Sequence, residues 1–168
     1  MENYIMLNGK KIPLTEEQIK LIQADVPEKS PFDRADKGET YYFMSHSFDV
    51  CDDEECRVGD DDDCYRCANY CTDESIMKQH ALHMLLNNLL WRYSMTHGGD
   101  KMKFERSTEE KYCIYYDNYN NDFCIYNGAY SKFPGTVYFI DAKTAKAAIE
   151  EIVKPFIESH PEFDVTKM

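Results

Sequence analysis

The segment from Glu74 to Thr96 most constrains the fold of this chain, because its apolar residues cover most of a helical circumference. Thr72 or Asp73 can cap its first turn, and a Gly98-Gly99 pair can stop it. Such an apolar helix is expected to be central and covered on more than one side. A narrow polar stripe remains, which should face solvent or be satisfied at a helix junction; it holds His80, His83, Asn87 and Ser94.

The N-terminal sequence "YIMLNGKKIPL" predicts a β-hairpin, since Asn8-Gly9 is a preferred type I′ turn pair between apolar arms. Thr15 and Gln18 then form a capping-box pattern for a short helix over residues 16–24. We expect residues 1–27 to be a semi-independent appendage of a single domain spanning 1–168.

Strand signals lie on both sides of the long helix. Residues 40–48 precede it, while "KYCIYYD", "DFCIYN" and "GTVYFI" follow it and predict an antiparallel meander. Asp141 then caps an amphipathic C-terminal helix that Pro155 should kink or end. The fold class expected is α+β: the N-terminal hairpin, central strands and C-terminal meander form an antiparallel sheet that packs with the two helices.

Residues 49–63 carry nine carboxylates against Arg57, a density that opposes regular structure. We therefore expect an exposed acidic loop there, with at most a short strand around Arg57. The following "CYRCANYC" predicts a strand in which Cys67 and Cys71 share one face and pack inward as small apolar side chains, whereas Cys64 points to the other face.

The formal net charge is −12, and this acidic field disfavours direct binding to nucleic acid or anionic membranes. It favours a basic protein partner, although solubility alone is a competing explanation. Carboxylates spaced like phosphates could occupy a groove that normally holds nucleic acid, with exposed tyrosines such as Tyr130 adding contact area. The candidate partner-binding residues are Asp52, Asp53, Glu54, Glu55, Asp60, Asp61, Asp62, Asp63, Tyr116 and Tyr119.

Zinc is the main alternative. Cys64, Cys67 and Cys71 have spacings near those of metal knuckles, and His80 or His83 could supply a fourth ligand. However, a strong zinc pattern has two CxxC-type pairs, and this chain has one. In the acidic stretch, the glycine and the distal glutamate are not at the positions that a calcium-binding EF-hand loop requires, so no cofactor is expected.

Enzyme motifs are missing from the sequence, which contains no GxSxG, no phosphate-binding glycine loop and no HExxH. No apolar run reaches transmembrane length, and the N-terminus does not have the pattern of a signal peptide. We expect a cytoplasmic protein with reduced cysteines that is not an enzyme.

The order of motifs resembles a diffuse family of small acidic proteins encoded by prophages and mobile elements of anaerobic bacteria. The resemblance covers roughly residues 38–157 and rests on "YRCANYCTDESIMKQHALHMLLNNLLWRYS", "KYCIYYD" and "VYFIDAKTAKAAIEEIVKPFI". Cysteines at positions 64, 67 and 71 depart from the family pattern. The resemblance implies no catalytic residues. It implies a protein that inhibits host machinery in the bacterial cytoplasm, most concretely an anti-CRISPR inhibitor of a Cas effector, whose nucleic-acid channels are basic.

Overall fold

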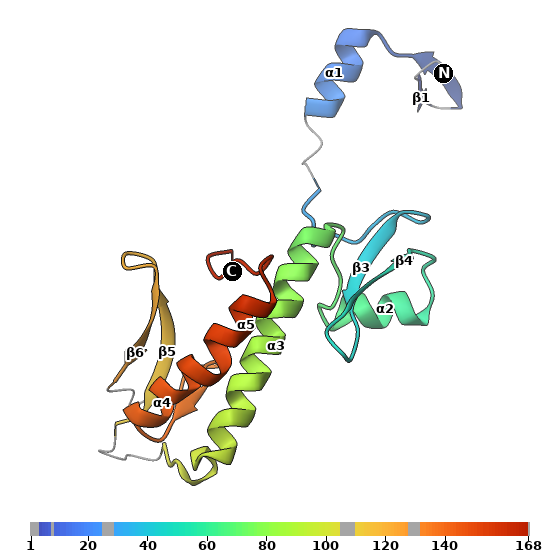
Figure 1. Ribbon diagram of the computed structural model, residues 1–168. Coiled ribbons are helices and arrows are strands. Elements are labelled where there is room, and N and C mark those ends of the chain that lie inside the picture. The colour runs from blue at the N-terminus through green and yellow to red at the C-terminus, as the bar shows by residue number, and fades with distance from the viewer. Residues whose placement is uncertain (1–3, 8, 25–28, 105–109, 128–131, 168) are drawn as a thin grey trace. The chain divides into compact units, whose positions relative to one another are not determined.

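The computed structural model describes residues 4–7, 9–24, 29–104, 110–127 and 132–167 (Figure 1). The chain divides into two compact units, Met1–Asp33 and Arg34–Met168. The first unit includes residues 1–27, which we expected from the sequence to be a semi-independent appendage.

The N-terminal unit contains a hairpin and a short helix, as the sequence predicts. Strands β1 (Tyr4–Leu7) and β2 (Lys10–Pro13) pair antiparallel with Leu7 opposite Lys10. Helix α1 spans Glu16–Ala24. Its predicted capping box is confirmed, because Thr15 N–H donates to Gln18 Oε1 at 3.0 Å and Gln18 N–H donates to Thr15 Oγ1 at 3.3 Å.

The larger unit is an α+β arrangement around one long helix, α3 (Figure 1). This confirms the α+β class expected from the sequence. The single antiparallel sheet expected there is wrong, because the described strands form separate sheets: β1-β2, β3-β4 and a three-stranded C-terminal sheet. Its elements in chain order are β3 (Thr40–Met44), β4 (Val50–Glu54), α2 (Gly59–Arg66), α3 (Glu74–Thr96), η1 (Gly99–Lys101), β5 (Tyr112–Asp117), β6 (Asp122–Tyr126), β7 (Tyr138–Phe139), α4 (Ala142–Ala148), η2 (Ile149–Val153) and α5 (Lys154–Ser159).

Helix α3 begins and ends where the sequence predicts. Asp73 Oδ1 accepts hydrogen bonds from the N–H groups of Ser75 and Ile76, at 2.8 and 3.1 Å. Gly98, just beyond the helix, adopts a left-handed φ of 92° that favours glycine. The β3–β4 hairpin and the C-terminal helices both contact α3, so it is covered on more than one side. Within the described residues, no helix is both long and apolar enough to cross a bilayer.

The polar stripe of α3 is not uniformly solvent-facing. Ser94 is buried and its hydroxyl donates to the Tyr138 carbonyl on β7. His83 packs its ring against Phe163, with centroids 4.6 Å apart. Ser94 is therefore satisfied at a junction between elements, whereas His83 is half-buried there and its Nε2 has no hydrogen-bond partner among the described residues.

The C-terminal strands form one antiparallel sheet of order β6-β5-β7. The predicted meander is therefore wrong in its last pairing, because Tyr112 of β5 lies opposite Phe139 of β7. Phe139, Ala145 and Ala148 form a fully buried cluster between this sheet and α4. The burial of Phe139 favours this strand order, because β7 paired with β5 places Phe139 against the alanines of α4.

The helical segment after Asp141 runs through α4, η2 and α5. Asp141 caps it as predicted, since its Oδ1 accepts from the Thr144 N–H at 2.7 Å. The π-helical turn η2 ends at Val153, two residues before Pro155. Proline cannot donate to a carbonyl in the preceding turn, which explains an irregular turn at this point. Val153 and Phe156 then pack against Leu86 of α3.

The acidic stretch is not an exposed loop, which corrects the prediction for residues 49–63. Residues 50–54 form β4, paired with β3, and α2 begins at Gly59. The strand predicted over residues 64–71 is also wrong, because most of it belongs to α2 and its end; only Cys71 makes a strand-like bridge, to Tyr42. Aspartate is a poor helix former in general, but in the first turn its charge is stabilised by the helix dipole.

Candidate functional site

The structure separates the eight predicted acidic residues into two groups. Glu55 and Asp61 are buried, with 0% and 2% of their surface exposed. They are therefore not available to a partner, contrary to the prediction. The exposed group lies on β4 and α2 and contains Asp52, Asp53, Glu54, Asp60, Asp62 and Asp63.

Glu55 is the centre of a buried polar network. Arg34 donates to both carboxylate oxygens, from Nε to Oε2 and from Nη2 to Oε1, each at 2.9 Å. Tyr70 Oη donates to Oε2 at 2.8 Å and the Arg57 N–H donates to Oε1 at 2.9 Å. The Arg34 guanidinium is the main reason why the pKa of Glu55 lies below its usual value. Burial and the neighbouring carboxylate raise the pKa of Tyr70 to about 12.

Asp61 fixes the start of α2 to the end of β4. Its Oδ2 accepts from the N–H groups of Cys56 and Val58, at 2.9 and 3.0 Å, and its Oδ1 accepts from Tyr41 Oη at 3.0 Å. The Val58 N–H contributes most to lowering the pKa of Asp61. A carboxylate in the first turn that binds the N–H of the preceding cap residue is half of a capping box. The sequence contained this signal at Val58 and Asp61, although valine lacks the usual hydroxyl.

The corner between β4 and α2 has a strained backbone at Arg57, whose φ is 64°. Arginine rarely adopts this left-handed conformation. Arg57 is held there by its N–H bond to Glu55 and by its guanidinium, which donates to the Ala35 carbonyl at 2.9 Å. The rings of Tyr41 and Tyr70 stack beneath the corner with centroids 4.2 Å apart. These contacts give the exposed carboxylates a rigid base.

Two of the six exposed carboxylates have ion-pair partners. Asp62 pairs with Arg34 at 2.7 Å and Asp63 pairs with Arg66 at 2.6 Å. Among the described residues, no ion pair is found for the other four, which are Asp52, Asp53, Glu54 and Asp60. Negative charge is therefore uncompensated on β4 and at the first turn of α2.

The carboxylates of β4 do not share one face. Successive side chains of a strand point to opposite sides, so Asp52 and Glu54 project with Val50, while Asp53 projects with Cys51. Asp53 lies opposite the buried Tyr41 in the β3–β4 register, on the side of α2. Asp52 therefore lies on the same face of β4 as Val50, which lines a pocket.

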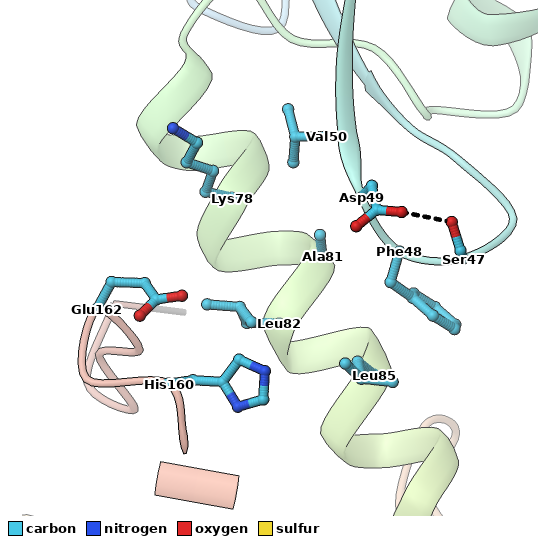
Figure 2. Close-up of a pocket in the computed structure, with 10 residues that line it drawn as sticks. All are labelled: Ser47, Phe48, Asp49, Val50, Lys78, Ala81, Leu82, Leu85, His160 and Glu162. Carbon is cyan, nitrogen blue, oxygen red and sulfur yellow. Dashed lines mark hydrogen bonds between the residues drawn. The ribbon is translucent and has the colours of Figure 1, made fainter. Parts of the chain in front are cut away.

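That pocket has a volume of about 340 Å³ and lies between the β3–β4 turn, α3 and the C-terminal segment (Figure 2). Figure 2 shows His160 and Glu162 on one side of the Leu82 side chain and the turn residues on the other. Its apolar surface comes from Phe48, Val50, Ala81, Leu82 and Leu85.

The polar lining of the pocket includes two carboxylates, Asp49 and Glu162, besides Ser47, Lys78 and His160. Asp49 accepts a hydrogen bond from Ser47 Oγ at 2.6 Å, and Glu162 lies on the exposed C-terminal segment. Lys78 is a cation in the pocket, but its Nζ pairs with Glu74 of the same helix at 2.7 Å. An apolar floor with carboxylates at the rim suits a long cationic side chain, whose stem is apolar and whose head is charged. Sequence reasoning missed this pocket because its residues come from three distant segments.

The predicted tyrosines do not join the acidic group. Tyr119 is 92% exposed at the β5–β6 turn, and Tyr116 of β5 is half-buried against the edge of Phe123. The β5–β6 and β3–β4 hairpins lie near opposite ends of α3 (Figure 1). The expected surface that combines tyrosines with the acidic residues is therefore wrong. Tyr130 lies outside the described residues.

The predicted zinc ligands do not come together. Cys71 is buried as expected, but Cys67 is exposed at the end of α2, where its Sγ donates to the Asp63 carbonyl at 2.9 Å. Cys64 packs against the Tyr41–Tyr70 cluster. In the described part of the chain, no three His, Cys, Asp or Glu side chains are arranged to hold a metal ion, His80 included.

Comparisons of the chain with protein-family models, with curated proteins and with solved structures find no match. The resemblance to prophage and mobile-element proteins therefore stays a prediction from the sequence.

Proposed function

We propose that this protein is a non-enzymatic binding protein that inhibits a host protein with a basic, nucleic-acid-binding groove. Its most concrete form is an anti-CRISPR inhibitor of a Cas effector in the bacterial cytoplasm. The observation that carries the proposal is the set of four exposed carboxylates without ion-pair partners among the described residues, held by the buried groups Glu55 and Asp61. The competing explanation is that charges on β4 only protect a strand edge from aggregation.

Rigid placement supports binding over simple solubility. A solvated acidic loop needs no buried carboxylate and no strained corner at Arg57. Here both are present, and they hold the backbone at the corner between β4 and α2, next to the exposed carboxylates. Fixed charges lose little entropy when a partner binds, and opposite charge on the partner accelerates the encounter.

The pocket beside Val50 provides the proposed anchor. A lysine or arginine of the partner would place its stem over Leu82 and Phe48 and its charged head between Asp49 and Glu162. Nucleic-acid-binding grooves are rich in such side chains. The zinc-stabilised module is the alternative from the sequence, but within the described residues its candidate ligands do not form a metal-binding group.

The test is inhibition of DNA cleavage by a guide-loaded Cas effector, together with direct binding measured at increasing salt. The double variant D52K/D60K should weaken binding at least tenfold, and binding of the unchanged protein should fall as salt rises. The control D100K/D122K changes the net charge equally at two exposed positions away from β4, α2 and the pocket. Equal effects of the two variants would show that only net charge matters, and absence of binding to Cas effectors would contradict the proposed inhibitor.

Neutralising the pocket rim tests the anchor separately. D49N/E162Q should weaken binding severalfold and should reduce its salt dependence, because two partner-facing charges are lost. Unchanged affinity would exclude the pocket while leaving the β4 and α2 carboxylates as the contact.

A further inference from the structure

The N-terminal unit exposes its apolar side chains instead of burying them. Within its described residues no side chain is buried, and eight large apolar residues are each 39–68% exposed. An isolated two-stranded hairpin is marginal in water, and about 30 residues are too few for an independent core. The unit is therefore incomplete by itself. The eight residues are Tyr4, Ile5, Met6, Leu7, Ile12, Leu21, Ile22 and Phe32.

The two edges of the hairpin differ in chemistry. Strand β2 carries Lys10, Lys11 and Pro13, and lysine and proline are the residues that protect a strand edge from pairing. Strand β1 has the sequence YIML, with neither charge nor proline. The outer edge of β1 is thus open to another strand, and the outer edge of β2 is not.

The register shows which backbone groups are available. In an antiparallel hairpin with a two-residue loop, the closing pair Leu7–Lys10 exchanges hydrogen bonds, and the pairs then alternate. Ile5 therefore also bonds to β2, whereas the N–H and C=O groups of Tyr4 and Met6 point to the outer edge of β1. Pro13 lies opposite Tyr4, so its backbone nitrogen faces the outer edge of β2. Because proline has no N–H, this edge has one hydrogen-bond donor fewer.

We propose that β1 pairs antiparallel with β1 of a second copy of this chain, which forms a four-stranded sheet of order β2-β1-β1′-β2′. Ile5 would lie opposite Ile5 of the second copy, and the outward groups of Tyr4 and Met6 would bond on either side of it. This pairing is related by a twofold axis, so the same surface serves both copies.

A second copy fits this edge better than a charged partner does. Identical strands that pair across a twofold axis bring like residues together, which is unfavourable for charged side chains. The uncharged sequence of β1 avoids this repulsion, whereas Lys10 and Lys11 would create it on β2. The pairing also doubles the apolar row of Ile5, Leu7 and Ile12 on one face of the sheet.

The experiment is sedimentation of the full chain and of matched variants at micromolar concentration. The unchanged protein is expected to sediment at twice the 19.7 kDa chain mass. I5K and I5E should each be monomeric, because each places two like charges opposite one another. An equimolar mixture of I5K and I5E should restore the dimer, which a merely unfolded hairpin could not do.

I12K is the matched control. Ile12 lies opposite Ile5 on the same hairpin, but it belongs to the outer strand of the proposed sheet, so I12K should remain dimeric. A monomeric unchanged protein, or a dimer that persists in I5K, would overturn the proposal. Equal dissociation of I5K and I12K without restoration in the mixture would also overturn it.

Discussion

Arg34 and Glu55 form a two-pronged ion pair in which Nε and Nη2 of the guanidinium each lie 2.9 Å from a carboxylate oxygen. The Glu55 side chain is fully buried and that of Arg34 is 21% exposed. The pair joins the segment before β3 to the corner after β4. It therefore determines where the acidic stretch lies in the fold.

Removing the buried carboxylate should strongly destabilise the larger unit. E55A should lower the free energy of unfolding by about 3 kcal/mol, because Arg34, Tyr70 and the Arg57 N–H lose a common acceptor. Urea denaturation measures this. E54A is the control, since Glu54 is exposed one residue earlier, and its effect should be within about 0.5 kcal/mol. Similar losses for the two variants would mean that the network is not stabilising.

Asp61 should make the protein sensitive to acid. Its folded pKa is lowered, mainly by the Val58 N–H, so below pH 5 the unfolded chain takes up a proton more readily than the folded protein does. Stability is therefore present above the usual aspartate pKa of about 3.9 and is lost as the pH falls through the lower folded value. D61N should be less stable at pH 7 and should lose less stability between pH 5 and pH 3. D60N, altered at an exposed neighbour, should retain the slope of the unchanged protein. A D61N slope as steep as that of D60N would contradict this role.

His83 should contribute a second pH dependence near neutrality. Burial lowers its pKa in spite of a backbone hydrogen bond with Asp164, and its Nε2 is buried with no hydrogen-bond partner among the described residues. The unfolded chain therefore binds a proton near pH 6.5 that the folded protein resists, so stability falls as the pH drops from 7.5 to 5.

H83Q, which cannot titrate, should show a smaller drop in thermal midpoint over this range than the unchanged protein. His46 is exposed on the β3–β4 turn, and H46Q is the control that should leave the drop unchanged. Identical pH profiles for H83Q and the unchanged protein would rule out this contribution of His83.

The cysteines should react according to their burial. Cys67 is exposed, whereas Cys71 is buried and burial raises the pKa of its thiol. Iodoacetamide followed by mass spectrometry should modify Cys67 at least tenfold faster than Cys71 under native conditions, since the thiolate is the reactive form. C67S should leave the urea midpoint unchanged. Loss of the fold in C67S, together with one equivalent of bound zinc in the unchanged protein, would restore the zinc-stabilised module.

Local signals explain what could be predicted from the sequence. The capping residues Thr15, Asp73 and Asp141 predict the starts of three helices, because each cap satisfies N–H groups within three residues of itself. The hairpin at Gly9 and the length of α3 follow from turn chemistry and from the extent of the apolar sequence. These features depend on neighbours along the chain and needed no tertiary information.

Other features depended on partners far away in the sequence. The last strand pairs with β5 because Phe139 is buried under α4, and the pocket unites the β3–β4 turn with Leu82 and Glu162. Helix α2 was missed because the acidic composition suggested a loop, although the first-turn aspartates and the Asp61 bond to Val58 stabilise its start.

The sequence by itself determined the α+β class, the central helix, the N-terminal hairpin and the strongly acidic character. Only the tertiary structure decided which carboxylates are exposed. Glu54 and Glu55 are adjacent and chemically alike, as are Asp60 and Asp61, but one of each pair is buried. A carboxylate can be buried only where donors replace its water. Those donors, Arg34 and Tyr70 for Glu55 and Tyr41 for Asp61, reach it only when distant segments fold together.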